Sequence, residues 1–99
     1  MIALAKIMDA SRRLKGVVEH TKLAFAPKLS ELSQAKVYVK QENLQNTGSF
    51  KLRGAFNKIA TLTQEERKNG VIASSAGNHA QGVAYSAKHY GIRAVIVMP

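Results

Sequence analysis

The sequence contains no cysteine and no tryptophan. The lack of cysteine excludes a disulfide framework, a thiolate metal site and a cysteine nucleophile, and it fits a reducing compartment such as the cytoplasm. Long apolar runs are also absent: the longest, Ala94 to Met98, is far shorter than the ~20 residues of a membrane helix. Charged residues such as Lys6 and Asp9 interrupt the N-terminal segment, which argues against a secretory signal. We therefore expect a cytoplasmic protein with no membrane partner.

Acidic residues are scarce, at 6 against 15 lysines and arginines, which gives a net charge of +9. So basic a chain could bind anionic partners, and charge alone leaves open a basic binding module without catalysis. The basic residues are, however, spread along the chain and are not interleaved with aromatic residues, as a nucleic-acid stacking surface would require. We expect a solvated basic surface and no nucleic-acid partner.

The composition, 45% hydrophobic and 21% charged, is typical of a folded chain. The spacing of Leu4, Ile7 and Leu14 predicts a first helix that ends near Gly16. The later predicted elements are an extended piece over 22–26, one or two helical turns over 28–32, a strand over 35–40, a helix from an N-cap at Ser49 to Leu62, a short helix opened by a Thr63–Glu66 capping box, a strand over 71–73, a helix over 78–90 stopped by Gly91, and a strand over 93–98.

Alternation of strands and helices predicts an α/β fold, with three parallel strands joined by right-handed crossovers and partly covered by helices. Such a partial open sheet leaves two free edges and incomplete cover. We therefore expect residues 1–99 to be the first part of a longer fold.

Two segments join a predicted strand to a helix, where open parallel sheets bind ligands. The first, Asn46–Gly54, places Lys51 in the first turn of a helix, where the positive end of the dipole disfavours a cation. This field, together with burial, favours a neutral amine that can attack an aldehyde. An ordinary surface lysine is the alternative that the residues leave open.

The second segment, Ser74–Gly82, offers small residues and backbone N–H groups at a helix start, which is suited to a carboxylate or a phosphate. An empty turn with Asn78 as a helix cap is the alternative. His79 could act as an acid or a base, although a lone histidine is more often structural. His20 and His89 receive no role.

Taken together, Ser-Phe-Lys-x-Arg-Gly at 49–54 and Ser-Ala-Gly-Asn-His at 75–79 resemble the threonine dehydratase (threonine ammonia-lyase) and serine dehydratase family. These are pyridoxal-phosphate enzymes of the tryptophan-synthase-β-like fold (fold type II). The similarity extends over almost the whole chain, including Leu14–Val18, Glu42–Gln45 and Val95–Pro99.

The resemblance implies roles for the matching residues. Lys51 would hold the aldehyde of pyridoxal 5'-phosphate and move the α-proton of the substrate, Phe50 would pack on the pyridine ring, and Asn78 would bind the phenolic oxygen of the ring. The substrate carboxylate would be bound by the loop of Ser75, Ala76, Gly77, Asn78 and His79. No metal is implied. Residues 1–99 would be the N-terminal part of a pyridoxal-phosphate-dependent catalytic domain, and we expect no activity from this part alone, because half of the cofactor contacts would be absent. The implied reaction converts L-threonine or L-serine to a 2-oxo acid and ammonia, in isoleucine biosynthesis or threonine catabolism, by a homo-oligomer.

Two features narrow the resemblance. Leu52–Arg53 after the lysine indicates the dehydratase and serine racemase branch. Racemases usually have a serine where this sequence has Ala76, and racemisation needs a proton donor on each face of the carbanion, so elimination is favoured over racemisation. A serine racemase or a related hydroxy-amino-acid dehydratase remains the alternative.

The sequence also departs from the family pattern. Thr21-Lys22-Leu23 stands where relatives have Thr-Pro-Leu, and Asn46 stands where many have arginine. Some members bind a regulatory nucleotide near positions that match Asn46, Thr47 and Gln81, so these three are candidate effector residues.

Overall fold

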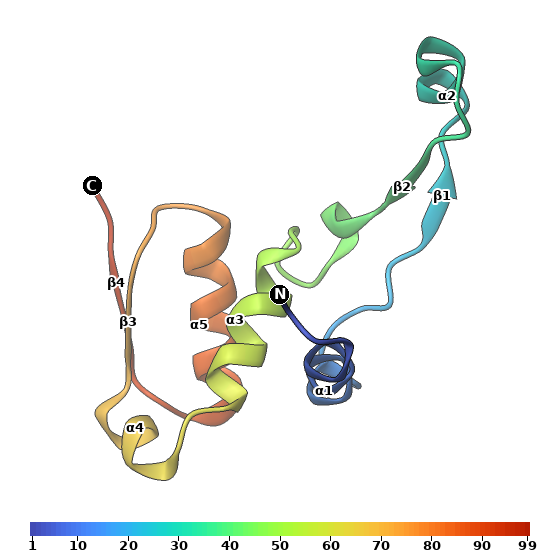
Figure 1. Ribbon diagram of the computed structural model, residues 1–99. Coiled ribbons are helices and arrows are strands. Elements are labelled where there is room, and N and C mark those ends of the chain that lie inside the picture. Colours follow the sequence, from blue (N-terminus) through green and yellow to red (C-terminus); the bar gives the residue numbers. More distant parts are fainter.

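The computed structural model describes residues 1–99, which form a helical body and a projecting arm (Figure 1). The body consists of α1 (Leu4–Leu14), α3 (Lys51–Ala60), α4 (Gln64–Asn69), β3 (Val71–Ser74), α5 (Asn78–Tyr90) and β4 (Ala94–Val97). The arm consists of β1 (Leu23–Phe25), α2 (Pro27–Ser33) and β2 (Tyr38–Lys40), and the short 3-10 helix η1 (Glu42–Leu44) leads back toward α3. The molecule is elongated, with extents of 51 × 36 × 27 Å.

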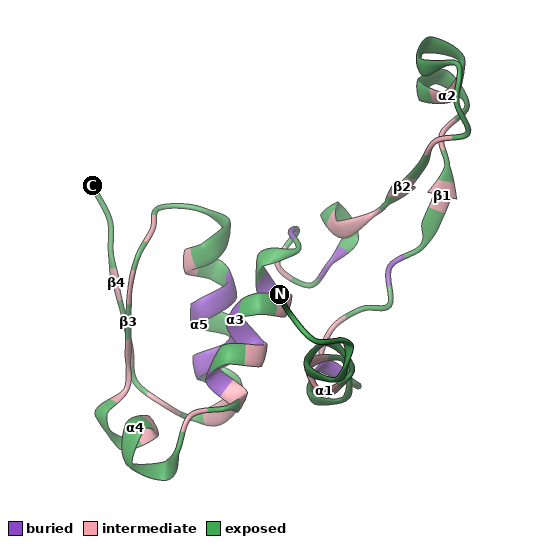
Figure 2. Ribbon diagram, in the orientation of Figure 1, coloured by how far each residue is buried: buried purple, intermediate pink, exposed green.

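The core lies where α3 packs against α5 and α1 (Figure 2). Leu52 and Phe56 are fully buried and contact Leu14 of α1, while Ile59 packs with Val83 of α5. Burial of each large apolar side chain contributes about 1.5–3 kcal/mol, so the α3–α5 contact is the main source of stability. Rigid packing at this contact fixes the helix whose first residue is Lys51.

A two-stranded parallel sheet flanks the helices, with Val71 opposite Ala94 and Ser74 opposite Val97. One face of the sheet packs on the core through residues such as Ala73 and Ile96, whereas Ile72 on the other face is 74% exposed. The sheet is therefore covered by helices on one side only (Figure 1).

The expectation of three parallel strands is wrong. β2 pairs antiparallel with β1, in a separate sheet with Phe25 opposite Tyr38, and not with β3 or β4. The alternation of half-buried valines, Val37 and Val39, predicts a strand but carries no information about its partner. The nearby β1 supplies that partner, joined to β2 through α2, and the rings of Phe25 and Tyr38 pack edge to face at 5.4 Å.

The helices are closer to expectation. The α5 bounds, the Thr63–Glu66 capping box of α4 and the stop of α1 before Gly16, whose φ is +78°, are confirmed. The N-cap of α3 is Phe50, one position after the predicted Ser49, but the Ser49 hydroxyl supplies the capping acceptor, 3.3 Å from the Lys51 N–H.

No helix of the structure has both the length and the apolar character that crossing a bilayer requires. The structure contains no group of three or more His, Cys, Asp or Glu side chains able to hold a metal ion.

Candidate functional site

Lys51 begins α3 directly after a tight turn. Gly48 has a φ of +70°, a conformation that glycine adopts without strain, and the buried Ser49 accepts a hydrogen bond from the Lys51 N–H at 3.3 Å. The Lys51 side chain is exposed, and its Nζ lies 5.1 Å from the centre of the Phe50 ring. The amine and the ring therefore share one exposed surface.

The sequence predicted two features around this amine, a helix N-terminus and burial, and the structure has only the first. The position at the N-terminus of α3 is as expected, but residues 1–99 do not bury the side chain. The expectation that burial favours the neutral amine is therefore not met by these residues.

The second segment leaves the sheet at Ser75, whose N–H donates to the Val97 carbonyl at 3.0 Å. The Ser75 hydroxyl then accepts a bond from the Gly77 N–H at 3.3 Å. The N–H groups of Ala76, Asn78 and His79 donate no hydrogen bond within the chain. Because they stand at the positive end of α5, they can bind an anion. Gly77 is the N-cap of α5, so the alternative of an empty turn with Asn78 as the helix cap is wrong about the cap.

Packing of α3 on α5 brings the two segments together at Gly82. A Cβ at this position would lie 3.2 Å from the backbone carbonyl carbon and oxygen of Lys51, and 3.3 Å from the Cβ of Ala55. Asn78 lies one turn before Gly82 on α5. The start of α5 and Lys51 therefore lie at the same end of the helix pair. Helix packing brings them together, and not the shared sheet edge that the sequence predicted.

His79 lines a cavity of about 290 Å³ beside α3 and β3, together with apolar residues such as Ile59 and Val71. Neither Lys51 nor Asn78 lines this cavity. The His79 side chain therefore does not share this cavity with Lys51. His89 packs edge to face on Phe56 at 5.0 Å.

The candidate effector residues lie near Tyr85. The Asn46 Nδ2 donates to the Val17 carbonyl at 3.0 Å and lies 3.5 Å from the Tyr85 hydroxyl. The Thr47 hydroxyl is buried and has no hydrogen-bond partner. Gln81 is exposed one turn before Tyr85 on α5. No motif or spacing in the sequence predicts a role for Tyr85.

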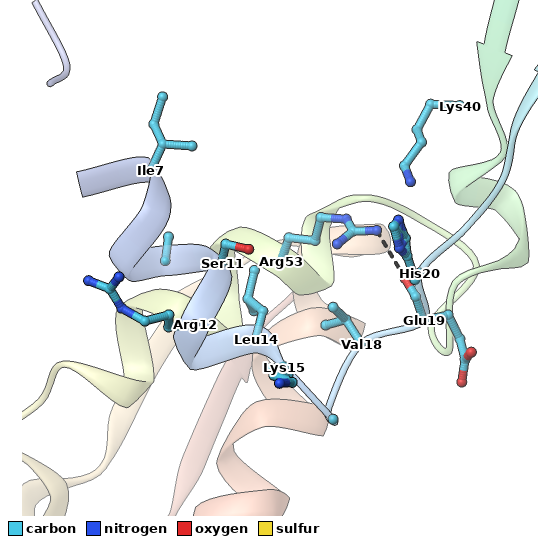
Figure 3. A pocket seen from close by; sticks show the side chains of 12 residues that line it. Ile7, Ser11, Arg12, Leu14, Lys15, Val18, Glu19, His20, Lys40 and Arg53 are labelled. Carbon is cyan, nitrogen blue, oxygen red and sulfur yellow. Dashed lines mark hydrogen bonds between the residues drawn. The ribbon is translucent and has the colours of Figure 1, made fainter. Parts of the chain in front are cut away.

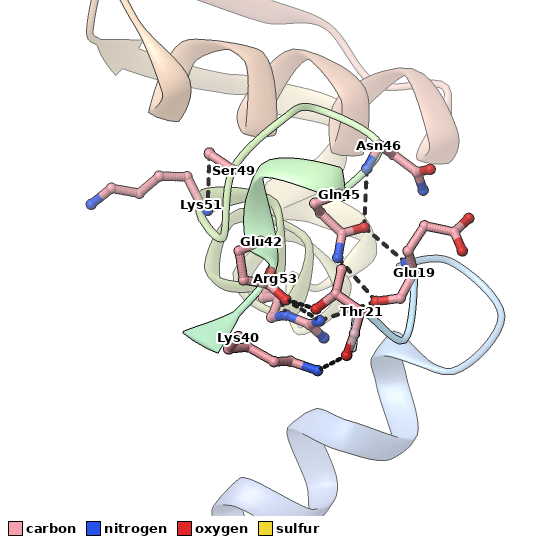
Figure 4. A network of polar contacts seen from close by, with 9 residues as sticks. All are labelled: Glu19, Thr21, Lys40, Glu42, Gln45, Asn46, Ser49, Lys51 and Arg53. Atoms are coloured by element: carbon pink, nitrogen blue, oxygen red, sulfur yellow. Dashed lines mark hydrogen bonds and ion pairs between the residues drawn. The ribbon is translucent and has the colours of Figure 1, made fainter. Parts of the chain in front are cut away.

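A polar network lies on the other side of α3 from Lys51 (Figure 4). Arg53 donates from Nε to Glu42 Oε2 at 2.9 Å and from Nη2 to Glu42 Oε1 at 2.7 Å. The bonds from Arg53, and then the bond from the Thr21 hydroxyl, lower the pKa of the Glu42 carboxyl from 4.5 to about 2, against the opposing effect of burial. The bond to Glu42 raises the pKa of Arg53 above its ordinary value. Both groups therefore remain charged over the whole physiological range.

A second cavity, of about 550 Å³, lies between the end of α1 and the base of the arm (Figure 3). Arg53, His20 and Lys40 line it together with residues of α1, but Lys51, Phe50 and Asn78 do not. The candidate site is therefore an open surface at the start of α3 and α5, and not either of these cavities.

Sequence reasoning missed the functions of two residues within or beside the motifs. Gly82 lies in the interior of α5, where glycine is about 1 kcal/mol less favourable for the helix than alanine. A glycine at such a position therefore indicates that close packing requires it. Arg53 stands two residues after the candidate amine, but its partner Glu42 belongs to a different segment, and no local spacing identifies that pair.

Comparison with known proteins gives consistent matches. A family model described as "Pyridoxal-phosphate dependent enzyme" matches residues 14–99. The L-threonine ammonia-lyase of Thermotoga maritima is 61% identical over 99 residues, which are 100% of this chain and 25% of that protein. The biosynthetic L-threonine dehydratase of Bacillus subtilis is 48% identical over 99 residues, covering 100% of this chain and 24% of that protein.

Among solved structures, serine racemase from Dictyostelium discoideum matches with a TM-score of 0.92 and 38% identity, covering 99% of this chain and 32% of that one. The chain spans about a quarter of the length of the curated relatives named above.

Proposed function

Because the chain belongs to the pyridoxal-phosphate-dependent enzyme family, we propose that it is the lysine-bearing N-terminal part of a catalytic domain that converts L-threonine, and also L-serine, to a 2-oxo acid and ammonia. The observation that carries this proposal is the 61% identity to an L-threonine ammonia-lyase over every residue of the chain. The family and the fold resemblance found in the sequence are confirmed by these matches.

The residues present fit one part of the cofactor. A primary amine and an exposed aromatic ring lie side by side at Lys51 and Phe50, and unpaired N–H groups lie at the adjacent start of α5. Lys51 would hold the aldehyde carbon, Phe50 would cover a face of the ring, and Asn78 would donate to the phenolic oxygen. Pyridoxal phosphate, when bound, supplies an electron sink for the negative charge that develops at the substrate α-carbon.

The chain's own chemistry is proton transfer and carboxylate binding. The Lys51 Nζ takes the α-proton of the substrate, since it is the basic side chain at the start of α3, beside the Phe50 ring. The N–H groups of Ala76, Asn78 and His79 bind the substrate carboxylate, with Ser75 and Gly77 fixing the loop through their mutual hydrogen bond. The electron pair left at the α-carbon then forms the Cα–Cβ double bond as the Cβ–O bond breaks, and the β-hydroxyl takes up a proton and leaves as water.

Serine racemisation is the second candidate, favoured by the TM-score of 0.92 to a serine racemase. Ala76 weighs against it, because a methyl group cannot deliver a proton to the opposite face of the substrate. Chiral analysis of serine after incubation with the enzyme separates the two reactions: pyruvate without D-serine supports elimination, and D-serine at a comparable rate supports racemisation.

We also propose a cytoplasmic homo-oligomer, with Asn46, Thr47 and Gln81 at an effector site for a nucleotide. Support for the effector site comes from the buried, unpartnered hydroxyl of Thr47 and from the nearby phenol of Tyr85. Support for an oligomer comes from exposed apolar side chains such as Leu32, which is 72% exposed.

A chimera tests the proposed reaction. Residues 1–99 replace the matching quarter of the T. maritima relative, so that the only lysine in the motif is Lys51 of this chain. We expect the chimera to form 2-oxobutanoate from L-threonine. Lys51→Ala should lower kcat by about 10²–10⁴-fold, which is the usual contribution of a positioned acid–base group. The matched control is Lys58→Ala, an exposed lysine of the same helix, with kcat within about twofold of the parent. Full turnover by the Lys51→Ala chimera would refute the assignment.

A further inference from the structure

The helix end that carries Lys51 has only a weak side-chain cap. Phe50 occupies the N-cap position of α3 without a capping bond, and the 3.3 Å bond from the Lys51 N–H to Ser49 is long. A weakly capped first turn tends to fray. A residue whose function depends on its direction therefore needs another source of rigidity.

Arg53 supplies a contact of the required kind, within the first turn of α3. Its guanidinium binds Glu42 through two parallel bonds of 2.9 and 2.7 Å, the arrangement that fixes both distance and direction. The Arg53 side chain is 31% exposed and the Glu42 side chain 14% exposed, whereas the partners of the Lys28–Glu31 pair on α2 are 78% and 72% exposed. The Arg53–Glu42 pair is therefore much better shielded from water than an ordinary surface pair.

The pair also ties α3 to the two segments that precede it. The Arg53 Nη2 donates to the Glu19 carbonyl at 3.0 Å, and the Thr21 hydroxyl donates to Glu42. The buried side chain of Gln45 accepts from the Glu19 N–H at 2.8 Å and donates back to the Glu19 carbonyl at 3.0 Å. The first turn of α3 is thus bound to residues 19–21 and 42–45 at once.

The geometry relates this network to Lys51. Two residues apart on a helix, the side chains of Lys51 and Arg53 leave the axis roughly 200° apart. Figure 4 shows Lys51 directed away from Glu42 and Arg53. Contacts of Arg53 on one side and of Leu52 in the core oppose rotation or unwinding of the first turn, and so fix the point and direction at which the Lys51 side chain leaves the helix.

We propose that the Arg53–Glu42 ion pair is a positioning contact that reinforces the weakly capped first turn of α3 and keeps Lys51 directed at the reacting atoms. This inference rests on the proposed function for the role of Lys51. Neither Arg53 nor Glu42 touches substrate or cofactor in this account; both act through the backbone of the first turn of α3.

The test uses the chimera with Arg53→Lys and Glu42→Gln, singly and together, and Arg12→Lys and Glu31→Gln as controls from the exposed pairs of α1 and α2. Arg53→Lys keeps the charge but loses the fork. We expect each single variant to lower kcat about 10–100-fold with little change in KM, because a small misplacement of a reacting group has that effect. The double variant should be no worse than either single one, since both remove the same contact.

Hydrogen exchange of the cofactor-free chimera gives a second readout. Amides at 51–54 should exchange at least about tenfold faster in both variants, with amides in the second half of α3 unchanged, because only the first turn is released. Lys51→Ala in the same background separates the two hypotheses: if it retains turnover, the proposed function fails. If Lys51→Ala abolishes turnover but Arg53→Lys and Glu42→Gln keep parental kcat and parental exchange, the positioning role fails alone. A loss of kcat that only matches a loss of folded protein also overturns it.

Discussion

Gly82 shows how a single residue fixes the distance between the two halves of the site. Its missing side chain lets the α5 backbone approach the Lys51 carbonyl, where a Cβ would come within 3.2 Å. Contacts this short can be relieved only by moving α3, and α3 carries the candidate amine. The glycine is therefore required by packing and not by backbone conformation.

Substitution of this glycine tests that statement. Gly82→Val in the chimera should destabilise the fold by about 1–3 kcal/mol, the usual cost of overpacking a core. Ala84→Val, at an exposed position of the same helix, is the matched control, since it carries the same β-branched penalty without the contact. Urea unfolding midpoints measure both. Equal midpoints for the two variants would show that the α3–α5 approach is not tight at Gly82.

For single residues, the sequence predicts chemical roles better than it predicts which side chains contact one another. Lys51, Asn78 and the loop at 75–79 follow from motif and resemblance, and their roles remain predictions. Glu42 and Arg53 could not be paired from the sequence, because eleven positions and a turn separate them and only the folded chain brings them together. The burial expected for Lys51 fails because residues 1–99 leave it on the surface.

The elements differ in how far local signals define them. The capping box of α4 and the glycine stops of α1 and α5 act within a few residues, so their helices are predictable. The partner of β2 is a choice among strands, which local alternation does not encode, and the predicted three-stranded sheet failed for that reason. The N-cap of α3 lies one residue after Ser49, although the Ser49 hydroxyl still accepts from the Lys51 N–H in the first turn.

The link between α3 and η1 predicts a dependence of stability on pH. Because folding lowers the pKa of Glu42 from 4.5 to about 2, the folded state holds its carboxylate charged where the unfolded chain takes up a proton. The stabilisation is complete above about pH 4.5 and is lost as the pH falls toward about 2. Glu66, whose pKa is lowered by its bonds to Thr63, acts in the same direction.

Unfolding midpoints of the parent and Glu42→Gln chimeras between pH 6 and pH 2.5 isolate the contribution of Glu42, roughly the 1.5–3 kcal/mol of a charge-assisted hydrogen bond. The parent should lose more stability than the variant as the pH falls through this window. Parallel curves would contradict the pKa shift and, with it, the strength of the Arg53–Glu42 link.

At the scale of the whole molecule, the chain is a small core with much uncovered apolar surface. Only 12 of 99 residues are buried, and side chains such as Ile72 and Leu32 stand in solvent. The α/β class and the family were predictable from composition, element order and motifs, and they are confirmed. The sequence does not predict which of these surfaces another part of the protein or a second copy would cover, because those contacts are not made within residues 1–99.

Chemical trapping tests the central claim most directly. The chimera is incubated with pyridoxal phosphate, reduced with borohydride, digested and analysed by peptide mass spectrometry, so that any lysine joined to the aldehyde is permanently labelled. The account predicts a stoichiometric pyridoxyl label on the peptide that contains Lys51, and none on Lys58 or Lys28. Labelling spread over exposed lysines, with Lys51 no more modified than the others, would contradict it.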